Sequence, residues 1–265
     1  MTVSNQPIEL DAPKAGNSSR RAVMFILIGC AMLFSILNFG VTRLAESLDQ
    51  TWAALIVTAF MLIVALVLQR VFFKQDVTRG LRALGFGRPN PRAILVAAII
   101  AAIMVAFFPI FSLSTGAQIS LRSDWLWVLL AIVVFNGIGE ETLFRGFVFG
   151  GLRKEAGLSF RRAGLISMVI FAAVHLLLFI GNPFFVGFLG TLVALASAFP
   201  MAYLFERGNN TIWAPVVLHV GTHMIRLVDI SELHYFLAVG IWLAIQIGMV
   251  FLVYAFLGNL LNTRE

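Results

Sequence analysis

Two adjacent carboxylates, Glu140 and Glu141, and the guanidinium of Arg145 lie inside an apolar run at residues 125–152. A run of this length can cross a membrane as a helix. Each ionised side chain at the centre of such a helix costs roughly 2.5–3.5 kcal/mol, even on the mildest insertion scales. Ionisable groups inside a membrane therefore mark a functional site by default, and this cluster is the first candidate.

Helix spacing divides the cluster into two parts. Glu141 and Arg145 lie four residues apart, so in an α-helix they share a face and can neutralise each other. Glu140 lies about 100° further round the helix and has no cationic partner there. The spacing predicts that Glu140 is the carboxylate left free for chemistry. The alternative is that all three charges form a clamp between helices.

Three of the four histidines, His175, His219 and His223, also fall in apolar segments. With the helix directions that the loop charges indicate below, these rings and Glu140 lie roughly 12–18 Å below the same membrane surface, at 1.5 Å per residue. His219 and His223 are four residues apart and share a helix face. Scattered packing histidines are not expected to share a depth, so the pattern predicts one polar site.

A buried carboxylate beside histidines suits general-base activation of a water molecule. No serine or cysteine is placed to act as a nucleophile in this cluster. The alternative is a metal, because Glu140, His175, His219 and His223 include enough nitrogen and oxygen ligands for tetrahedral zinc with one position left for water. The spacing is not H-E-x-x-H, so the zincin signature is absent. Both chemistries stay open.

The same residues resemble the three signatures of the CPBP family, which comprises the type II CAAX prenyl endopeptidases and the bacterial Abi proteins. The first is Glu140-Glu141-x-x-x-Arg145, with Asn136 one turn earlier. The second is Phe171-x-x-x-His175, in which the phenyl ring can shield the imidazole. The third is Asn210-x-Ile212-Trp213-Ala214-Pro215 leading into His219-x-x-x-His223. The likeness covers about a third of the chain, and the rest matches only as hydrophobic helices.

The resemblance implies an intramembrane protease of eight helices whose active site opens toward the cytoplasm. By this likeness Glu140 and His175 activate the water, and His219 helps to bind the oxyanion. Glu141 and Arg145 hold their helix in place. The implied substrate is a membrane-associated protein or peptide, either a CAAX-type prenylated protein or a leader peptide. No cofactor is required if the mechanism is glutamate-type, and zinc is the candidate if the family's usual metalloprotease label applies.

One position departs from the family pattern, because the third signature usually ends in Asn and here ends in His223. A neutral histidine can donate one hydrogen bond, so an oxyanion role survives, while a third histidine also strengthens the metal alternative. Two other functions stay open: a non-catalytic scaffold or bacteriocin-immunity protein with the same fold, and a proton-coupled transporter. Retention of Glu140, His175 and His219 favours the protease, and the lack of a detectable repeat counts against the transporter.

The rest of the chain supplies the helices that must hold this site. It is 60% hydrophobic and 12% charged, with a mean hydropathy of +0.94, whereas soluble domains carry about 25% charged residues. The composition predicts an all-α polytopic bundle in the lipid bilayer, multi-pass at the cell membrane. About eight transmembrane helices are expected, at residues 22–41, 52–69, 93–111, 125–152, 163–180, 184–205, 211–228 and 235–257.

The domain organisation follows from the same pattern. Residues 1–21 are polar and predict a disordered cytoplasmic tail, and residues 22–261 predict a single transmembrane protease domain with a signature-bearing core at about 125–228. The single cysteine, Cys30, excludes an internal disulfide. The net charge of +6 does not indicate a nucleic-acid partner, because Lys and Arg gather on the cytoplasmic side of membrane proteins.

The distribution of basic residues also predicts the orientation. Fifteen of the 19 Lys and Arg residues lie in the two termini and in alternate loops, which places both termini in the cytoplasm. Reporter fusions after Arg79 and after Lys154 should therefore report the cytoplasm, and a fusion after Arg122 should report the outside. A cytoplasmic signal at Arg122 would contradict the shared depth of Glu140 and the histidines.

Overall fold

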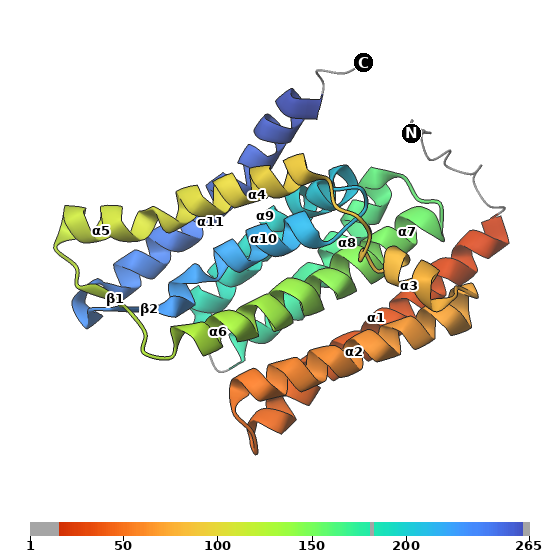
Figure 1. Cartoon of the computed structure of the whole chain (residues 1–265), viewed down its shortest axis with the longest axis horizontal. Coiled ribbons are helices and arrows are strands. Elements are labelled where there is room, and N and C mark those ends of the chain that lie inside the picture. Colours follow the sequence, from red (N-terminus) through yellow and green to blue (C-terminus); the bar gives the residue numbers. More distant parts are fainter. Residues whose placement is uncertain (1–15, 181–182, 262–265) are drawn as a thin grey trace, which may run out of the picture.

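The computed structural model describes residues 16–180 and 183–261, which form a bundle of helices (Figure 1). The first half comprises α1 Gly16–Ala45, α2 Gln50–Phe73, α3 Val77–Ala83, α4 Pro91–Val105, α5 Phe107–Thr115 and strand β1 Ile119–Leu121. The second half comprises α6 Trp125–Ala131, the π-helical η1 Ile132–Glu140 and η2 Thr142–Gly150, α7 Gly151–Lys154, α8 Phe160–His175, the 3₁₀ turn η3 Leu176–Phe179, α9 Phe184–Arg207, α10 Trp213–Thr222, the 3₁₀ turn η4 Met224–Leu227, strand β2 Val228–Ile230 and α11 Glu232–Leu261.

Seven helices of the described part are long and apolar enough to cross a membrane. They are Ser18–Ala45, Gln50–Phe73, Pro91–Thr115, Trp125–Lys154, Phe160–Phe179, Phe184–Arg207 and Glu232–Gly258. This finding confirms the expected all-α polytopic membrane bundle. The start of α1 and the end of α11 both lie at the end of the bundle away from the strands (Figure 1). Which end faces the cytoplasm stays a prediction.

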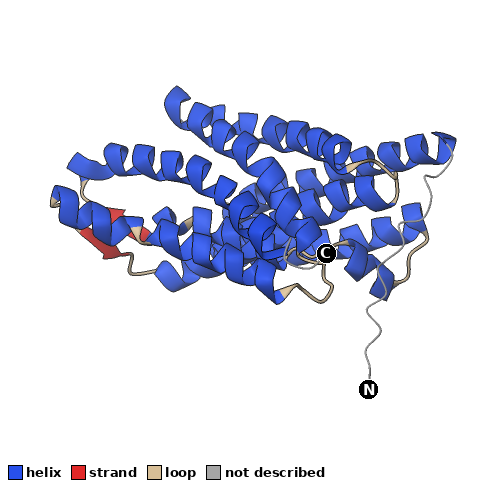
Figure 2. Cartoon of the chain, turned by 90° about the horizontal axis from the view of Figure 1, so that it is seen from above, coloured by secondary structure: helices blue, strands red, loops and turns tan. Residues whose placement is uncertain are grey.

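The helix in the segment 211–228 is shorter than the membrane helix that the hydropathy predicts there. Only α10 is α-helical there, and the Thr222 hydroxyl donates to the His219 carbonyl at 2.6 Å as that helix ends. Val228 then pairs with Leu121 in a two-stranded antiparallel sheet of β1 and β2, at one end of the bundle (Figure 2). The ten residues of α10 pack against α4, α9 and η1, so this apolar helix lies inside the protein.

Three other expected boundaries move for identifiable reasons. The span at 93–111 divides between α4 and α5, because Pro109 cannot donate to the Val105 carbonyl one turn earlier. The span at 163–180 is α-helical only as far as His175 and continues as the 3₁₀ turn η3. Helix α1 begins at Gly16, so the last six residues of the expected tail are helical, and Ser19 there donates to the Ala156 carbonyl at 2.6 Å. Residues 1–15 lie outside the described part.

The buried apolar side chains form two clusters. One surrounds η2, with Phe144, Phe147 and Phe149 against α1, α2 and α8, and the other joins α4, α5 and α11 around Trp242. Helices α9 and α10 contribute to both clusters, so α10 lies between the two halves of the core. A polar side chain on α10 is therefore held by packing on both sides.

A close backbone contact fixes the position of η2 relative to the segment after α3. A Cβ added at Gly146 would overlap the main-chain carbonyl of Leu84, with the carbonyl carbon at 2.7 Å. Leu84 is fully buried and its main chain cannot move freely aside. Glycine is therefore required at Gly146 to let the two main chains approach.

Gly146→Ala is expected to lower the free energy of unfolding by about 1–3 kcal/mol, the usual cost of overpacking a core. Thermal unfolding in detergent measures this effect. Gly240→Ala is the matched control, because no described atom lies within 4 Å of a Cβ added there and alanine favours the helix. Equal stability of the two variants would contradict the packing argument.

Candidate functional site

The helix that carries the carboxylates is wound more widely than the α-helix expected at residues 125–152. It is α-helical in α6 and then π-helical through η1 and η2, on either side of Glu141. π-Helical turns are rare and occur frequently at functional sites. A π-helix has more residues per turn than an α-helix, so the side chains that share a face differ from those expected for an α-helix.

Glu141 is a fully buried carboxylate with two partners. Its Oε1 accepts from Arg145 Nη1 at 3.1 Å, as the spacing predicts, and contacts His219 Nδ1 at 2.6 Å. Both charged side chains are almost fully buried, at 0% exposure for Glu141 and 3% for Arg145. The pair therefore compensates its charge inside the bundle, and His219 joins η2 to α10 through it.

The contact with Glu141 orients the His219 ring. A carboxylate only accepts, so His219 Nδ1 carries the proton and donates to Glu141. The opposite nitrogen, Nε2, then lies 3.9 Å from Glu140 Oε2. His219 consequently presents Nε2 toward the carboxylate that the sequence predicts to be free for chemistry.

Glu140 is less enclosed than Glu141 and is held by a neutral donor. Its side chain is 14% exposed, and its Oε1 accepts from Asn136 Nδ2 at 2.7 Å. The Asn136 carbonyl oxygen in turn accepts from Arg226 Nη1 at 3.2 Å. Because a guanidinium can only donate, Arg226 fixes which end of the Asn136 amide faces Glu140.

His175 lies at the last residue of α8 and is also held by one ring nitrogen. Nδ1 donates to the main-chain carbonyl of Phe171 at 2.7 Å, which leaves Nε2 with a free lone pair in the neutral ring. The Phe171 ring packs edge-on to His175 at 4.4 Å between centroids and lies 4.6 Å from the Arg145 guanidinium. Phe171 therefore separates the imidazole from the buried cation.

His223 stacks on His219, with ring centroids 5.2 Å apart and planes inclined by 25°. Its ring nitrogens have no hydrogen-bond partner among the described residues. Unlike His175 and His219, it is therefore free to offer either nitrogen to a ligand.

One cavity of about 590 Å³ receives the predicted site residues. Glu140, His175, His219 and His223 all line it, together with Asn136, Arg145 and Phe171. Glu141 does not line it, in agreement with its full burial behind His219. The structure thus brings together groups from η1, α8 and α10, and the catalytic roles of these residues stay predictions.

Arg226 and Gln246 line the cavity but were not among the predicted site residues. The signal for Gln246 is present in the sequence, because a glutamine in the middle of an apolar membrane span is costly. The signal for Arg226 is weaker, because it lies two residues before the end of the expected span at 211–228, where basic residues are common, and the structure places it in the short turn η4.

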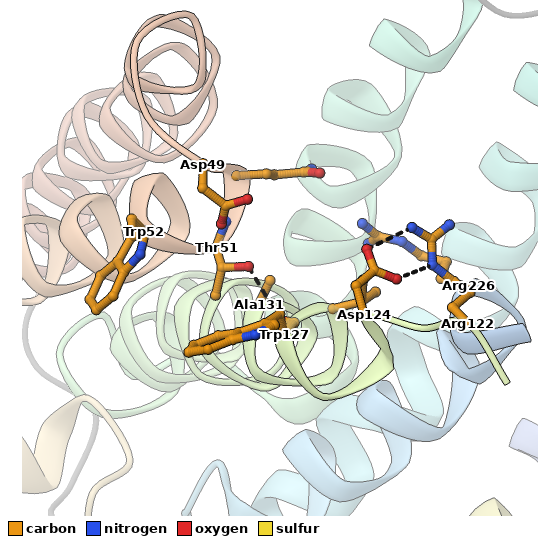
Figure 3. Close-up of a pocket in the computed structure, with 10 residues that line it drawn as sticks. Asp49, Thr51, Trp52, Arg122, Asp124, Trp127, Ala131 and Arg226 are labelled. Atoms are coloured by element: carbon orange, nitrogen blue, oxygen red, sulfur yellow. Dashed lines mark hydrogen bonds and ion pairs between the residues drawn. The ribbon is translucent and has the colours of Figure 1, made fainter.

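A second, smaller pocket of about 240 Å³ also has Arg226 in its lining (Figure 3). It lies between the start of α2 and the start of α6 and is also lined by Asp49, Trp52 and Trp127. Within it Asp124 accepts two hydrogen bonds from Arg122, both at 2.9 Å, and these bonds lower the pKa of the Asp124 carboxyl below its usual value. Arg226 is therefore the cation of this pocket that reaches toward the Glu140 network.

The same side chains are the candidate ligands for a metal ion. No three His, Cys, Asp or Glu side chains of the described residues stand together as ligands for one ion. His175 and His219 each use Nδ1 for a protein contact and keep Nε2 free, and His219 Nε2 lies 3.9 Å from Glu140 Oε2. The described residues thus present no preformed group of three ligands, and zinc binding stays a prediction.

Chemically, the site offers a partly enclosed carboxylate, two histidines with Nε2 free and a third histidine that has no hydrogen-bond partner among the described residues, all facing one cavity. Residues 122–225 match the family of type II CAAX prenyl endopeptidase Rce1-like proteins, and this stretch contains all three signatures. No curated protein and no solved structure matches the chain. The chain is a multi-pass membrane protein, and the family match supports its membership of the CPBP family.

Proposed function

We propose that the protein is an intramembrane endopeptidase that hydrolyses a peptide bond of a membrane-associated substrate. The family match supports a protease, and the observation that carries the proposal is the convergence of Glu140, His175, His219 and His223 on one cavity. These residues come from three separate elements, and their side chains bring a base and hydrogen-bonding groups together. Such a set serves hydrolysis by activated water.

Glu140 is the base in this mechanism. Asn136 holds one carboxylate oxygen, so the other is free to accept a proton from a water molecule in the cavity. His175 presents an unprotonated Nε2 and can hold the same water by its second hydrogen. The hydroxide attacks the carbonyl carbon of the substrate, and Glu140 then passes its proton to the leaving nitrogen.

His219 and His223 stabilise the negative charge that develops on the carbonyl oxygen. His223 can donate from a neutral ring, because neither of its nitrogens is engaged by described residues. His219 already donates Nδ1 to Glu141, so it donates from Nε2 only as an imidazolium, with the Glu141 carboxylate as counter-charge. The stacked rings thus place two donors side by side.

The cavity walls favour a substrate with an apolar, membrane-associated segment. Away from the catalytic groups the cavity is lined mostly by apolar side chains of α1, η3, α9 and α11, such as Leu37, Leu177, Val193 and Leu243. A CAAX-type prenylated protein or a leader peptide presents such a segment beside a peptide bond. The family match favours the CAAX type.

The first test distinguishes the role of Glu140 from that of Glu141. Glu140→Gln keeps the Asn136 contact but removes the base, so cleavage of a peptide panel should fall by about 10²–10⁴-fold while the unfolding temperature in detergent stays the same. Glu141→Gln leaves Arg145 without a full counter-charge in the core, and loss of one partner of a buried pair costs about 3–5 kcal/mol of stability.

Normal turnover by the Glu140→Gln variant would show that the base has been assigned wrongly. If the wild-type protein itself cleaves no peptide in the panel, a non-catalytic scaffold or immunity protein replaces the protease as the better explanation.

A second test uses the histidine at His223. If it only donates to the oxyanion, His223→Asn should keep most of the activity, because the amide is also a donor, whereas His223→Ala should lose about 10²–10³-fold. If it is a zinc ligand, His223→Asn should lose activity and metal together, because an amide is a far weaker ligand than imidazole. Peptide cleavage, metal content and the effect of a chelator are measured on the same purified proteins.

An active His223→Asn variant without bound metal would exclude His223 as an essential ligand. An inactive variant that has lost zinc and recovers when zinc is added would overturn the metal-free mechanism.

A further inference from the structure

Gln246 is a polar side chain on the otherwise apolar wall that α11 contributes to the cavity. Its neighbours on this wall are Val239, Trp242 and Leu243. The residue is 5% exposed, and it lies in the middle of a span with a mean hydropathy of 2.4. A carboxamide has two donors and two acceptor positions, so its burial in an apolar wall is costly unless it is hydrogen-bonded.

The amide of Gln246 has no hydrogen-bond partner among the described residues. Three other neutral polar side chains of the cavity differ in this respect, because each bonds a nearby main-chain carbonyl. Asn38 donates to Phe34, Ser197 donates to Ala194, and Thr222 donates to His219. Gln246 is thus almost fully buried, lines the cavity and makes no hydrogen bond with its amide to the described residues.

The position of Gln246 along the bundle places it near the catalytic groups. Trp242, one turn earlier on α11, donates from Nε1 to the Thr222 carbonyl at the end of α10, at 3.0 Å. Helix α11 runs in the opposite direction to α10 (Figure 1). Gln246 lies about 6 Å further along α11 than Trp242. Because the two helices run in opposite directions, this displacement points from Thr222 toward His219 on α10.

We propose that Gln246 hydrogen-bonds a peptide group of the bound substrate beside the scissile bond. The inference rests on the proposed endopeptidase function and names a substrate contact outside the family-matched residues 122–225. A carboxamide can donate to a peptide C=O and accept from a peptide N–H at once, which suits an extended chain. An apolar side chain of the substrate would leave the Gln246 amide unpaired, so the contact selects main chain at this point.

The test replaces the amide by a side chain of equal length. Gln246→Met should raise the KM for an internally quenched peptide that the wild type cleaves by about three- to tenfold, the range expected for one hydrogen bond, with kcat little changed. Its unfolding temperature in detergent should stay the same or rise, because an unpaired polar group leaves the core of the free protein.

Gln69→Met is the matched control. Gln69 is a glutamine of α2 with 2% exposure, its buried Oε1 has no partner among the described residues, and it does not line the cavity. Its replacement should likewise not lower the unfolding temperature, but it should leave KM unchanged. The pair thus separates the removal of a buried amide from the loss of a substrate contact.

An unchanged KM in Gln246→Met, while the wild type cleaves the peptide, would overturn the inference and leave the proposed function intact. A fall in unfolding temperature with KM unchanged would assign Gln246 to the structure of the bundle. Failure of the wild type to cleave any peptide would instead overturn the proposed function.

Discussion

A fully buried carboxylate is the constraint on which the site depends. Glu141 has no access to solvent, so its charge must be compensated inside the bundle, and Arg145 and His219 both contact the same oxygen. The contact with Arg145 lies within one helix, whereas the contact with His219 connects two elements 78 residues apart in sequence. An unpaired buried charge is strongly unfavourable, so the contact of His219 with Glu141 fixes the position of α10 relative to η2. It thereby also fixes the position of His219 Nε2 relative to Glu140.

The pairing within one helix could be predicted, and the pairing between helices could not. The spacing of Glu141 and Arg145 predicts their ion pair, which the structure contains. The resemblance assigned both residues to holding the helix and His219 to the oxyanion, but nothing in the spacing indicates that His219 also binds Glu141. That contact depends on how α10 packs against η1 and α4, which is set by side-chain shape over long sequence separations.

Hydropathy located the apolar segments but did not determine how each one is wound. It predicts a membrane helix at 125–152 and another at 211–228, whereas the first is largely π-helical and the second ends at Thr222. A helix enclosed by protein is as apolar as one enclosed by lipid, so length and composition do not separate the two cases. The break near Pro109 has a visible local cause, but the pairing of Val228 with Leu121 depends on a strand more than a hundred residues away.

Arg226 has a consequence for the membrane as a barrier. Arg226 lines both the cavity at Glu140 and the smaller pocket at Asp124. A protein that carries water-accessible hollows can remain tight to ions only through the groups that separate them. A fixed positive charge between two hollows repels protons and metal cations, as in channels that exclude cations by an arginine. The guanidinium of Arg226 would thus oppose the passage of cations between the cavity and the smaller pocket.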